Sequence, residues 1–453
     1  MHTLLIDLYE RLRANLWFLP AVMSVAAAVL AWILVALDEA GIGRDLIGDL
    51  RFVNLAPEGA RTILQTVATG MITAASLVFS LTFIALTLLS QQLGPRLLLI
   101  FMQDRTTQMI LGVFVAGFIH SLLVMGATGT GENQGFVPYL AVMAAVVIAI
   151  GAFGALVYFL HHIALFVQAD HTLAVIAKEL DSRIDDLVAT GRAAEERTED
   201  RRPTVGEERG RFEGQGTPVG AARDGYVYLF DFEALIAAAR RHDLKVLLDC
   251  RPGDFLVTGQ PMMRVIGLPE EERDDEDSLI DELRAAVTMG SARRPAADIE
   301  FEIAALVEVA LRALSAGIND PYTAAAAIDH LTAALCRIAR NPIRIGARAD
   351  EEGAARVWQM PRQFIHYFDS AYQPLRGSIR GKSQITQRLV HRIAMLIKCL
   401  RHRDSADGVA KFLRTLRRDI EEGMDNPDDR TQLCGELDHV LERLERRMKE
   451  LPE

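Results

Sequence analysis

The chain has 453 residues and a formal net charge of −11, and half of its residues are apolar. This acidic balance argues against broad nucleic-acid binding, which needs a basic face, and four cysteines without a CxxC pair argue against a disulfide framework or a zinc site. Because the apolar residues are concentrated in roughly the first 165 positions and the remainder is rich in charge, the composition predicts a membrane domain followed by a soluble domain.

Four stretches within this membrane domain, residues 1–165, are apolar enough to cross a bilayer, whose hydrocarbon core requires about 20 helical residues. They cover residues 16–37, 67–89, 107–125 and 136–160. The preceding residues, MHTLLIDLYERLRAN, mix apolar and charged positions, which predicts a short amphipathic segment on the membrane surface rather than a cleaved signal peptide.

Basic residues predict the orientation of the spans, since cytoplasmic loops carry an excess of Lys and Arg. The loop 91–106 holds two Arg, the loop between the third and fourth spans holds none, and the soluble part is rich in Arg. We therefore expect a multi-pass protein of the inner membrane with both termini in the cytoplasm. The loop 39–66, which this arrangement places outside, argues in the opposite direction because it carries Arg44, Arg51 and Arg61.

The second span belongs to a longer predicted helix, since Pro57 is a favourable first helical residue and Gly94-Pro95 is a favourable stop. At about 1.5 Å per residue this helix is roughly 55 Å long, so we expect it to tilt or to project from the bilayer. At 100° per residue its small polar side chains fall within about 40° of one line. This hydroxyl stripe consists of Thr62, Gln65, Thr69, Thr73, Ser76, Ser80 and Thr87, and Phe83 interrupts it.

Two interpretations of the hydroxyl stripe remain open. Small polar residues allow helices to approach closely and to hydrogen-bond across a membrane bundle, so the stripe is consistent with simple packing. Alternatively, several copies of the chain line a water-filled path, with Phe83 as a hydrophobic constriction. Because no charged residue lies on the stripe, such a path would not select strongly between ions.

Three histidines of the membrane domain are candidates for a functional role. His120 lies inside the third span, where an ionisable side chain is a functional candidate, although a neutral imidazole bonded to a Ser or Thr of the bundle is the simpler expectation. His161 and His162 are adjacent and point about 100° apart, which suits an interfacial role better than metal chelation.

The soluble part begins with a helical pattern that continues from the fourth span without Pro or Gly until Gly191, which predicts a stalk over residues 166–191. A charged linker at 192–222 follows. Strand-like runs such as GYVYLFD then predict a small β module over 223–268, and the amphipathic periodicity of 276–453 predicts a helical bundle. The expected fold class is therefore mainly α, with a four-helix membrane domain and a cytoplasmic α+β domain.

The segment LRALSAGINDPYTA contains a predicted helix–helix turn. Gly317 is expected to end the first helix, and Asp320 and Pro321 are expected to cap and begin the second. A free helix N-terminus near Arg312 also suits an anion, so Arg312, Asn319, Asp320 and Pro321 form a candidate site for an unknown small ligand or protein. Because Asp320 would repel an anion, the structural turn is the simpler interpretation.

Several motifs in a fixed order resemble one known family, the bacterial membrane proteins of domain-of-unknown-function family 2254. These are FSLTFIALTLLSQQLGPRLL, DRTTQMILGVFVAGF, FVPYL, YFLHHI, GYV and LRALSAGINDPYTA, and they extend over nearly the whole chain. The resemblance implies a four-span membrane domain with a cytoplasmic domain and no assigned activity. The family often has a Thr-x-x-Gln-Asp segment before the helical motif, of which RRPAADIEFEI keeps only Asp298.

No motif of a common enzyme class is present, since GxGxxG, P-loop, GxSxG and HExxH patterns are all missing from the sequence. We expect no enzyme, no cofactor, no metal and no nucleic-acid partner. The expected partners are the lipid bilayer and further copies of the chain. The two functional hypotheses are an oligomeric channel or solute pathway lined by the second span and gated by the cytoplasmic domain, and a non-conducting membrane scaffold or sensor.

Overall fold

The chain forms two compact units, Met1–His171 and Thr172–Glu453. The computed structural model describes residues 16–41, 56–92, 94, 104–129, 136–166, 168–196, 205–268, 273–291, 293, 298–341, 347–359 and 362–452. The predicted amphipathic segment at the N-terminus, half of the predicted loop 39–66 and most of the predicted loop 91–106 lie outside these residues.

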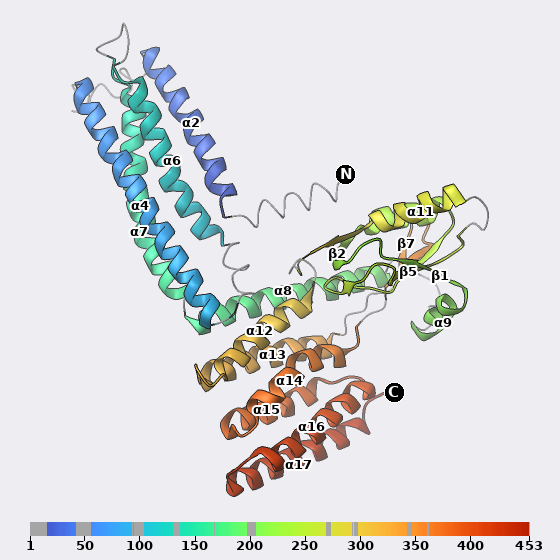
Figure 1. Cartoon of the computed structure of the whole chain (residues 1–453). Helices are drawn as coiled ribbons and strands as arrows, with labels where there is room; N and C mark the ends of the chain where they lie inside the picture. The colour runs from blue at the N-terminus through green and yellow to red at the C-terminus, as the bar shows by residue number, and fades with distance from the viewer. Residues whose placement is uncertain are drawn as a thin grey trace. The chain divides into compact units, whose positions relative to one another are not determined.

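The described part of the first unit consists of long helices (Figure 1). They are α2 (Phe18–Glu39), α4 (Pro57–Gln92), α6 (Arg105–Ala127) and α7 (Tyr139–Phe166). Each is long and apolar enough to cross a membrane. Each of the four predicted spans corresponds to one of these helices, and α4 begins at the proline that the sequence indicates.

Helix α6 contacts the other three helices of this unit. Two glycines on α6 allow this close approach. A Cβ atom at Gly112 would lie 2.4 Å from the Sδ atom of Met23 on α2, and one at Gly117 would lie 3.1 Å from the Cε atom of Met71 on α4. A side chain at either position would therefore require the neighbouring methionine to move.

The second unit contains two small sheets and a series of helices. Its strands are β1 (Thr217–Gly220), β2 (Gly225–Phe230), β3 (Lys245–Leu248), β4 (Phe255–Leu256), β5 (Pro261–Ile266), β6 (Val287–Gly290), β7 (Ala347–Ala349) and β8 (Ala355–Gln359). Its helices are α8 (Ala169–Glu196), which starts at the end of the first unit, α9 (Val205–Gln215), α10 (Phe232–Arg241), α11 (Arg273–Ala285), α12 (Ile299–Ala313), α13 (Pro321–Arg340), α14 (Phe364–Ile379), α15 (Ser383–Leu396), η2 (Ile397–Cys399), α16 (Arg403–Gly423) and α17 (Pro427–Met448).

The β module is assembled from distant parts of the sequence. One sheet has the order β1-β5-β3-β8-β7 and the other has the order β4-β2-β6. Strand β3 pairs parallel with β8, more than 100 residues later in the chain, and the other pairs are antiparallel. Apolar side chains of α10 and α11 share the core of this module. The module therefore extends beyond the predicted range 223–268, because β1, β6, β7 and β8 complete its sheets.

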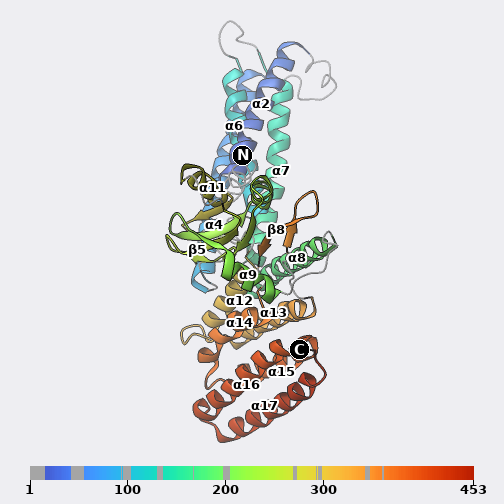
Figure 2. The ribbon, with the colours of Figure 1, turned by 90° about the vertical axis from the view of Figure 1, so that its right-hand side faces the viewer.

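Three helical hairpins, α12–α13, α14–α15 and α16–α17, are stacked on one another (Figures 1 and 2), and we call them the hairpin stack. Aromatic rings fill the contact between the second and third hairpins. The rings of Phe368 and Phe412 meet edge to face with centroids 5.2 Å apart, and Phe368 also contacts Tyr372 at 5.0 Å. All three side chains are fully buried.

The predicted stalk and linker differ from the structure. Helix α7 ends at Phe166 and α8 begins at Ala169, so the expected uninterrupted stalk is divided into two helices. One face of α8 is buried in the second unit, so α8 is a packed helix rather than a free rod. The predicted linker 192–222 contains the end of α8, the whole of α9 and strand β1.

Candidate functional site

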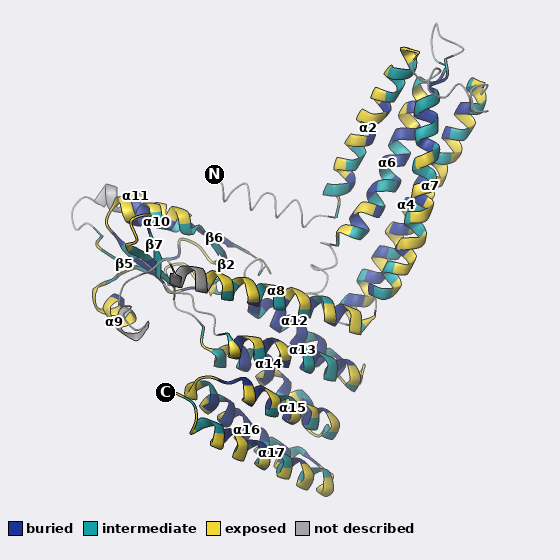
Figure 3. Ribbon diagram, turned by 180° about the vertical axis from the view of Figure 1, so that it is seen from behind, coloured by how far each residue is buried: buried dark blue, intermediate teal, exposed yellow. Residues whose placement is uncertain are grey.

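The hydroxyl stripe lies on the exposed side of α4 (Figure 3). All of its residues and Phe83 are exposed. The opposite side of the helix is buried against α6 and α7 and includes Leu64, Val78 and Leu89. Thr82, the hydroxyl residue that the periodicity places off the stripe, is buried on that opposite side. The four-helix unit therefore packs through the apolar side of α4 and leaves the polar side uncovered.

Most hydroxyls of the stripe bond to the backbone of their own helix. Thr73 Oγ1 donates to the Thr69 carbonyl at 2.7 Å and Ser76 Oγ donates to the Ile72 carbonyl at 2.9 Å. Thr62 and Thr87 form the same bond to the carbonyl four residues earlier. These hydroxyls need no partner from another helix, and their oxygens still present lone pairs to the surface.

A groove of about 820 Å³ runs along the stripe beside α7. Its lining combines hydroxyl and amide groups with small apolar side chains, namely Thr62, Gln65, Thr66, Thr69, Gly70, Thr73, Ala74, Leu77 and Leu156. A concave polar surface on a membrane helix is suited to contact with water or with another protein surface.

His120 is fully buried inside the four-helix unit. Its Nε2 atom lies 3.1 Å from the carbonyl oxygen of Ala141 on α7. Since a carbonyl only accepts, Nε2 carries the proton, and Nδ1 has no hydrogen-bond partner among the residues that the structure describes. The partner is thus a backbone carbonyl and not the Ser or Thr side chain that we expected.

Two charged side chains bind the ends of neighbouring helices in the first unit, a role that no pattern considered in the sequence assigned to them. Asp38 at the end of α2 accepts hydrogen bonds from the backbone N–H groups of Leu140 (2.9 Å) and Ala141 (3.2 Å) at the start of α7. Arg61 on α4 donates to the carbonyl of Thr128, just after α6, at 2.7 Å. Each charge has the sign that the helix end favours. The only signal in the sequence is a charge placed beside the end of an apolar span.

A second charged contact joins α6 to α7. The Asp104 carboxylate caps α6 by accepting from Thr107 N–H at 2.9 Å, and it lies 2.9 Å from His162 Nε2. Burial acts to raise the pKa of Asp104, but the hydrogen bonds from Thr107 and the contact with His162 outweigh it and hold the pKa below its usual value. His162 therefore has a structural partner, whereas the sequence suggested only an interfacial position.

The candidate site of Arg312, Asn319, Asp320 and Pro321 forms the helix–helix turn between α12 and α13. Asp320 caps α13 by accepting from the backbone N–H groups of Tyr322 (3.0 Å) and Thr323 (3.2 Å), and Pro321 is the first helical residue, as predicted. Asn319, rather than Gly317, adopts the left-handed backbone conformation, with a φ of +48°. Helix α12 already ends at Ala313.

Arg312 and Asp320, the charged residues of the motif, both have partners close to them in the chain. Arg312 points to Glu308 of its own helix, with 3.5 Å between Nε and Oε1. Asp320 uses its oxygens within the cap, where the hydrogen bonds from Thr323 and Tyr322 lower its pKa. The geometry accounts for the motif as a turn.

A network of charges joins the β module to the hairpin stack, and the sequence analysis missed it. Its members are Arg251 and Asp254 in the turn before β4, Arg293 after β6, Asp298 and Glu300 at the start of α12, and Arg362 before α14. We call it the junction network.

The guanidinium of Arg362 lies at the centre of the junction network. It is 2.6 Å from Glu300 Oε1 and 2.6 Å from Asp254 Oδ1, and thereby connects α12 to the turn before β4. Arg293 is 2.6 Å from Asp298 Oδ2. Burial raises the pKa of Glu300 and lowers that of Arg251, so these groups are withdrawn from water. The network contains as many acids as bases, which suits a structural joint between the two parts.

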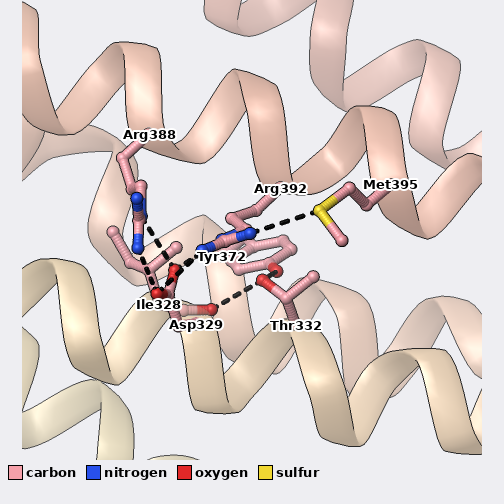
Figure 4. A network of polar contacts seen from close by, with 7 residues as sticks. All are labelled: Ile328, Asp329, Thr332, Tyr372, Arg388, Arg392 and Met395. Atoms are coloured by element: carbon pink, nitrogen blue, oxygen red, sulfur yellow. Dashed lines mark hydrogen bonds and ion pairs between the residues drawn. The ribbon is translucent and has the colours of Figure 1, made fainter.

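A third group of charges connects two hairpins of the stack (Figure 4). Asp329 on α13 accepts from Arg388 Nε at 2.9 Å and from Arg392 Nε at 2.6 Å, both on α15. Beside it, the hydroxyls of Thr332 and Tyr372 are 2.8 Å apart. Burial acts to raise the pKa of Asp329, but the two guanidinium groups outweigh it and lower the pKa. This contact fixes α15 against α13.

The described residues contain no group of three or more His, Cys, Asp or Glu side chains that is placed to hold a metal ion. A family profile described as a predicted membrane protein, DUF2254, matches residues 13–395 of the chain. The chain belongs to the DUF2254 family. This match confirms the family that the ordered motifs indicated. The protein is therefore a predicted membrane protein, and its four apolar helices α2, α4, α6 and α7 correspond to the predicted spans.

Two mycobacterial proteins that are similar to this DUF2254 protein are themselves described as uncharacterized. It is 29% identical over 361 residues to the uncharacterized proteins Mb1321c of Mycobacterium bovis and Rv1290c of Mycobacterium tuberculosis. The match covers 79% of this chain and 67% of each relative. No solved structure matches the chain.

Proposed function

We propose that this protein is an oligomeric channel or solute pathway of the inner membrane, lined by α4 and gated by the cytoplasmic unit. The observation that carries the proposal is the orientation of α4: its polar side is uncovered while its apolar side is buried in the four-helix unit. A membrane helix normally directs its polar side chains away from lipid, so this side of α4 is suited to face water or another copy of the chain.

The surroundings of the stripe support an assembly of several copies. Ile72, Phe79 and Ile84 are exposed on α4 and flank the hydroxyl residues. In a ring of copies these apolar side chains would contact the neighbouring subunits, while the stripe would face the axis. The Phe83 ring, which is 64% exposed, would narrow such a path as a hydrophobic constriction.

A non-conducting scaffold is the second candidate, in which the stripes of two copies contact each other without water. The backbone hydrogen bonds of Thr73, Ser76 and Thr87 favour it, because hydroxyls that are already bonded tolerate a dry interface. Both candidates are non-enzymatic, and both place the two termini in the cytoplasm. They differ in whether water reaches the stripe.

Ion flux through liposomes that contain the purified full-length protein tests the pathway. We expect the wild-type protein to release small ions under voltage or osmotic shock, and Phe83→Ala to increase the leak by widening the constriction. Phe79→Ala is the matched control, since Phe79 is also exposed on α4 but points about 80° away from the centre of the stripe. Absence of conduction in both the wild type and Phe83→Ala would refute the pathway.

Cysteine accessibility separates the two candidates, because the native cysteines are all in the second unit. A cysteine at Ser76 is expected to react with a membrane-impermeant thiol reagent if water fills a path along the stripe. An oligomer in which this cysteine does not react would favour the scaffold.

A further inference from the structure

Ion pairs join helix α8 to the first hairpin of the stack, and one apolar face of α8 is buried. Leu173, Ile176, Leu180 and Ile184 are buried at helical spacing along α8. On its flank, Arg337 of α13 lies 3.1 Å from Asp181 and 3.0 Å from Asp185. In the chain, only two residues separate the start of α8 from the end of the membrane helix α7.

Glu302 of α12 lies at the centre of this contact. Its side chain is only 2% exposed, and its Oε1 atom lies 3.0 Å from Nε of Arg183 on α8. The same guanidinium lies 3.0 Å from Glu179 Oε1, so Arg183 divides its charge between two carboxyl groups. The second oxygen of Glu302, Oε2, has no hydrogen-bond partner among the described residues. A carboxylate with so little compensation is expensive to bury, whereas a neutral carboxyl group is not.

The charged groups that face Glu302 reinforce this imbalance. Helix α8 contributes Arg183 and Glu179, and the start of α12 contributes Asp298. Arg337, the nearby base on α13, is already paired with the two aspartates of α8. Burial is the main cause that raises the pKa of Glu302 to about 8; Asp298 and Glu179 add to the shift, and Arg183 opposes it.

We infer that Glu302 makes the docking of α8 on the α12–α13 hairpin depend on a proton, so that acid tightens this contact and alkali loosens it. A regulatory effect of this proton on the membrane pathway rests on the proposed function. The docking equilibrium of α8 itself can be measured even if the protein conducts nothing. The ligand is a single proton, bound by a carboxyl group that is exposed to water only when α8 has moved away.

The direction follows from linkage between proton binding and docking. When α8 is docked, Glu302 titrates at about pH 8, and when α8 has moved away it regains water and titrates closer to the ordinary value of 4.5. The proton therefore stabilises the docked state most fully at low pH, and this contribution is lost as the pH rises through the folded pKa. Between the undocked pKa near 4.5 and the docked pKa of about 8, one linked proton changes the equilibrium constant for docking by at most about tenfold per pH unit.

Electron–electron distance measurements on the full-length protein in nanodiscs test the inference. Spin labels are attached to Ser182→Cys on α8 and Ala333→Cys on α13, both at exposed positions, in a background that carries Cys336→Ser and Cys434→Ser at the two partly exposed native cysteines. We expect a short, narrow distance distribution at pH 6 and a long-distance fraction that grows as the pH rises to about 8 and then levels off.

Three variants complete the test. Glu302→Gln, an uncharged isostere of the protonated side chain, is expected to keep the short distance at every pH. Arg183→Gln is expected to shift the transition to higher pH, because Arg183 opposes the increase in pKa. Glu308→Gln, on the same helix but paired with Arg312, is the matched control and is expected to respond like the wild type.

Two results would overturn the inference. One is a wild-type distance distribution that does not change between pH 6 and pH 9, and the other is a Glu302→Gln variant that responds to pH as the wild type does. Since none of these measurements involves ion flux, failure of the proton-dependent contact and failure of the membrane pathway are distinguishable.

Discussion

Replacing Gly253 by alanine tests how firmly the junction network joins the β module to the hairpin stack. Gly253 has a φ of +91°, and a Cβ atom there would lie 2.2 Å from Asp298 Oδ2 and 3.1 Å from Arg293 Nη2. Asp298 is buried, caps α12 by accepting from Glu300 N–H at 3.0 Å, and pairs with Arg293. The carboxylate has a short side chain with both oxygens engaged, so it moves only if these contacts break.

Two terms determine the expected loss of stability. A left-handed backbone conformation costs about 1–2 kcal/mol for alanine. Displacing one partner of a buried ion pair costs about 3 kcal/mol or more. The sum of about 4–5 kcal/mol corresponds to a decrease in melting temperature on the order of 10 °C for a unit of this size.

Gly259→Ala is the matched control for the conformational term. Gly259 has a similar φ of +83°, but a Cβ atom there meets nothing within 4 Å. We expect this variant to lose only about 1–2 kcal/mol. Thermal unfolding of the full-length protein in detergent, followed by circular dichroism, measures both variants. Equal melting temperatures for the two variants would refute the view that Asp298 is held in place by the junction network.

Two further predictions concern the charged contacts of the membrane unit. Asp38→Ala is expected to destabilise that unit by about 1–2 kcal/mol, because the first N–H groups of α7 lose their acceptor. The control Glu39→Ala, at the exposed neighbouring position, is expected to change the stability little. Denaturation in mixed micelles measures the stability of both variants. The lowered pKa of Asp104 stabilises the folded state at pH values above the usual pKa of 3.8, and this contribution is lost as the pH falls through the folded pKa. Acid titration is therefore expected to destabilise the wild type more steeply below about pH 4 than it destabilises Asp104→Asn. Identical titrations of the two proteins would contradict the stabilising role of the ionised Asp104.

Local patterns in the sequence predicted the features that depend on neighbouring residues. Apolar runs of about 20 residues located the four membrane helices, and the 100° periodicity separated the exposed stripe of α4 from its buried side. Asp320 and Pro321 indicated the start of α13, because a cap and a first-turn proline act within a few residues.

Features that depend on distant partners were not predictable in this way. Asp254 and Arg362 are separated by 108 residues and each resembles an ordinary surface charge in the sequence. The parallel pairing of β3 with β8 likewise has no local signal, so the β module was expected to end too early. The continuity of α7 and α8 was also misjudged, since no Pro or Gly marks the break between them.

The order of strands in the larger sheet has a consequence for how the protein is made. Strand β3 receives its neighbour β8 only after the whole α12–α13 hairpin has left the ribosome, because that hairpin lies between β6 and β7 in the chain. Until then β3 is a bare sheet edge formed by the apolar residues Val246, Leu247 and Leu248, which invites pairing with other nascent chains. An expression fragment of the β module that stops before Ala355 is therefore expected to aggregate, whereas one that includes β8 closes this edge.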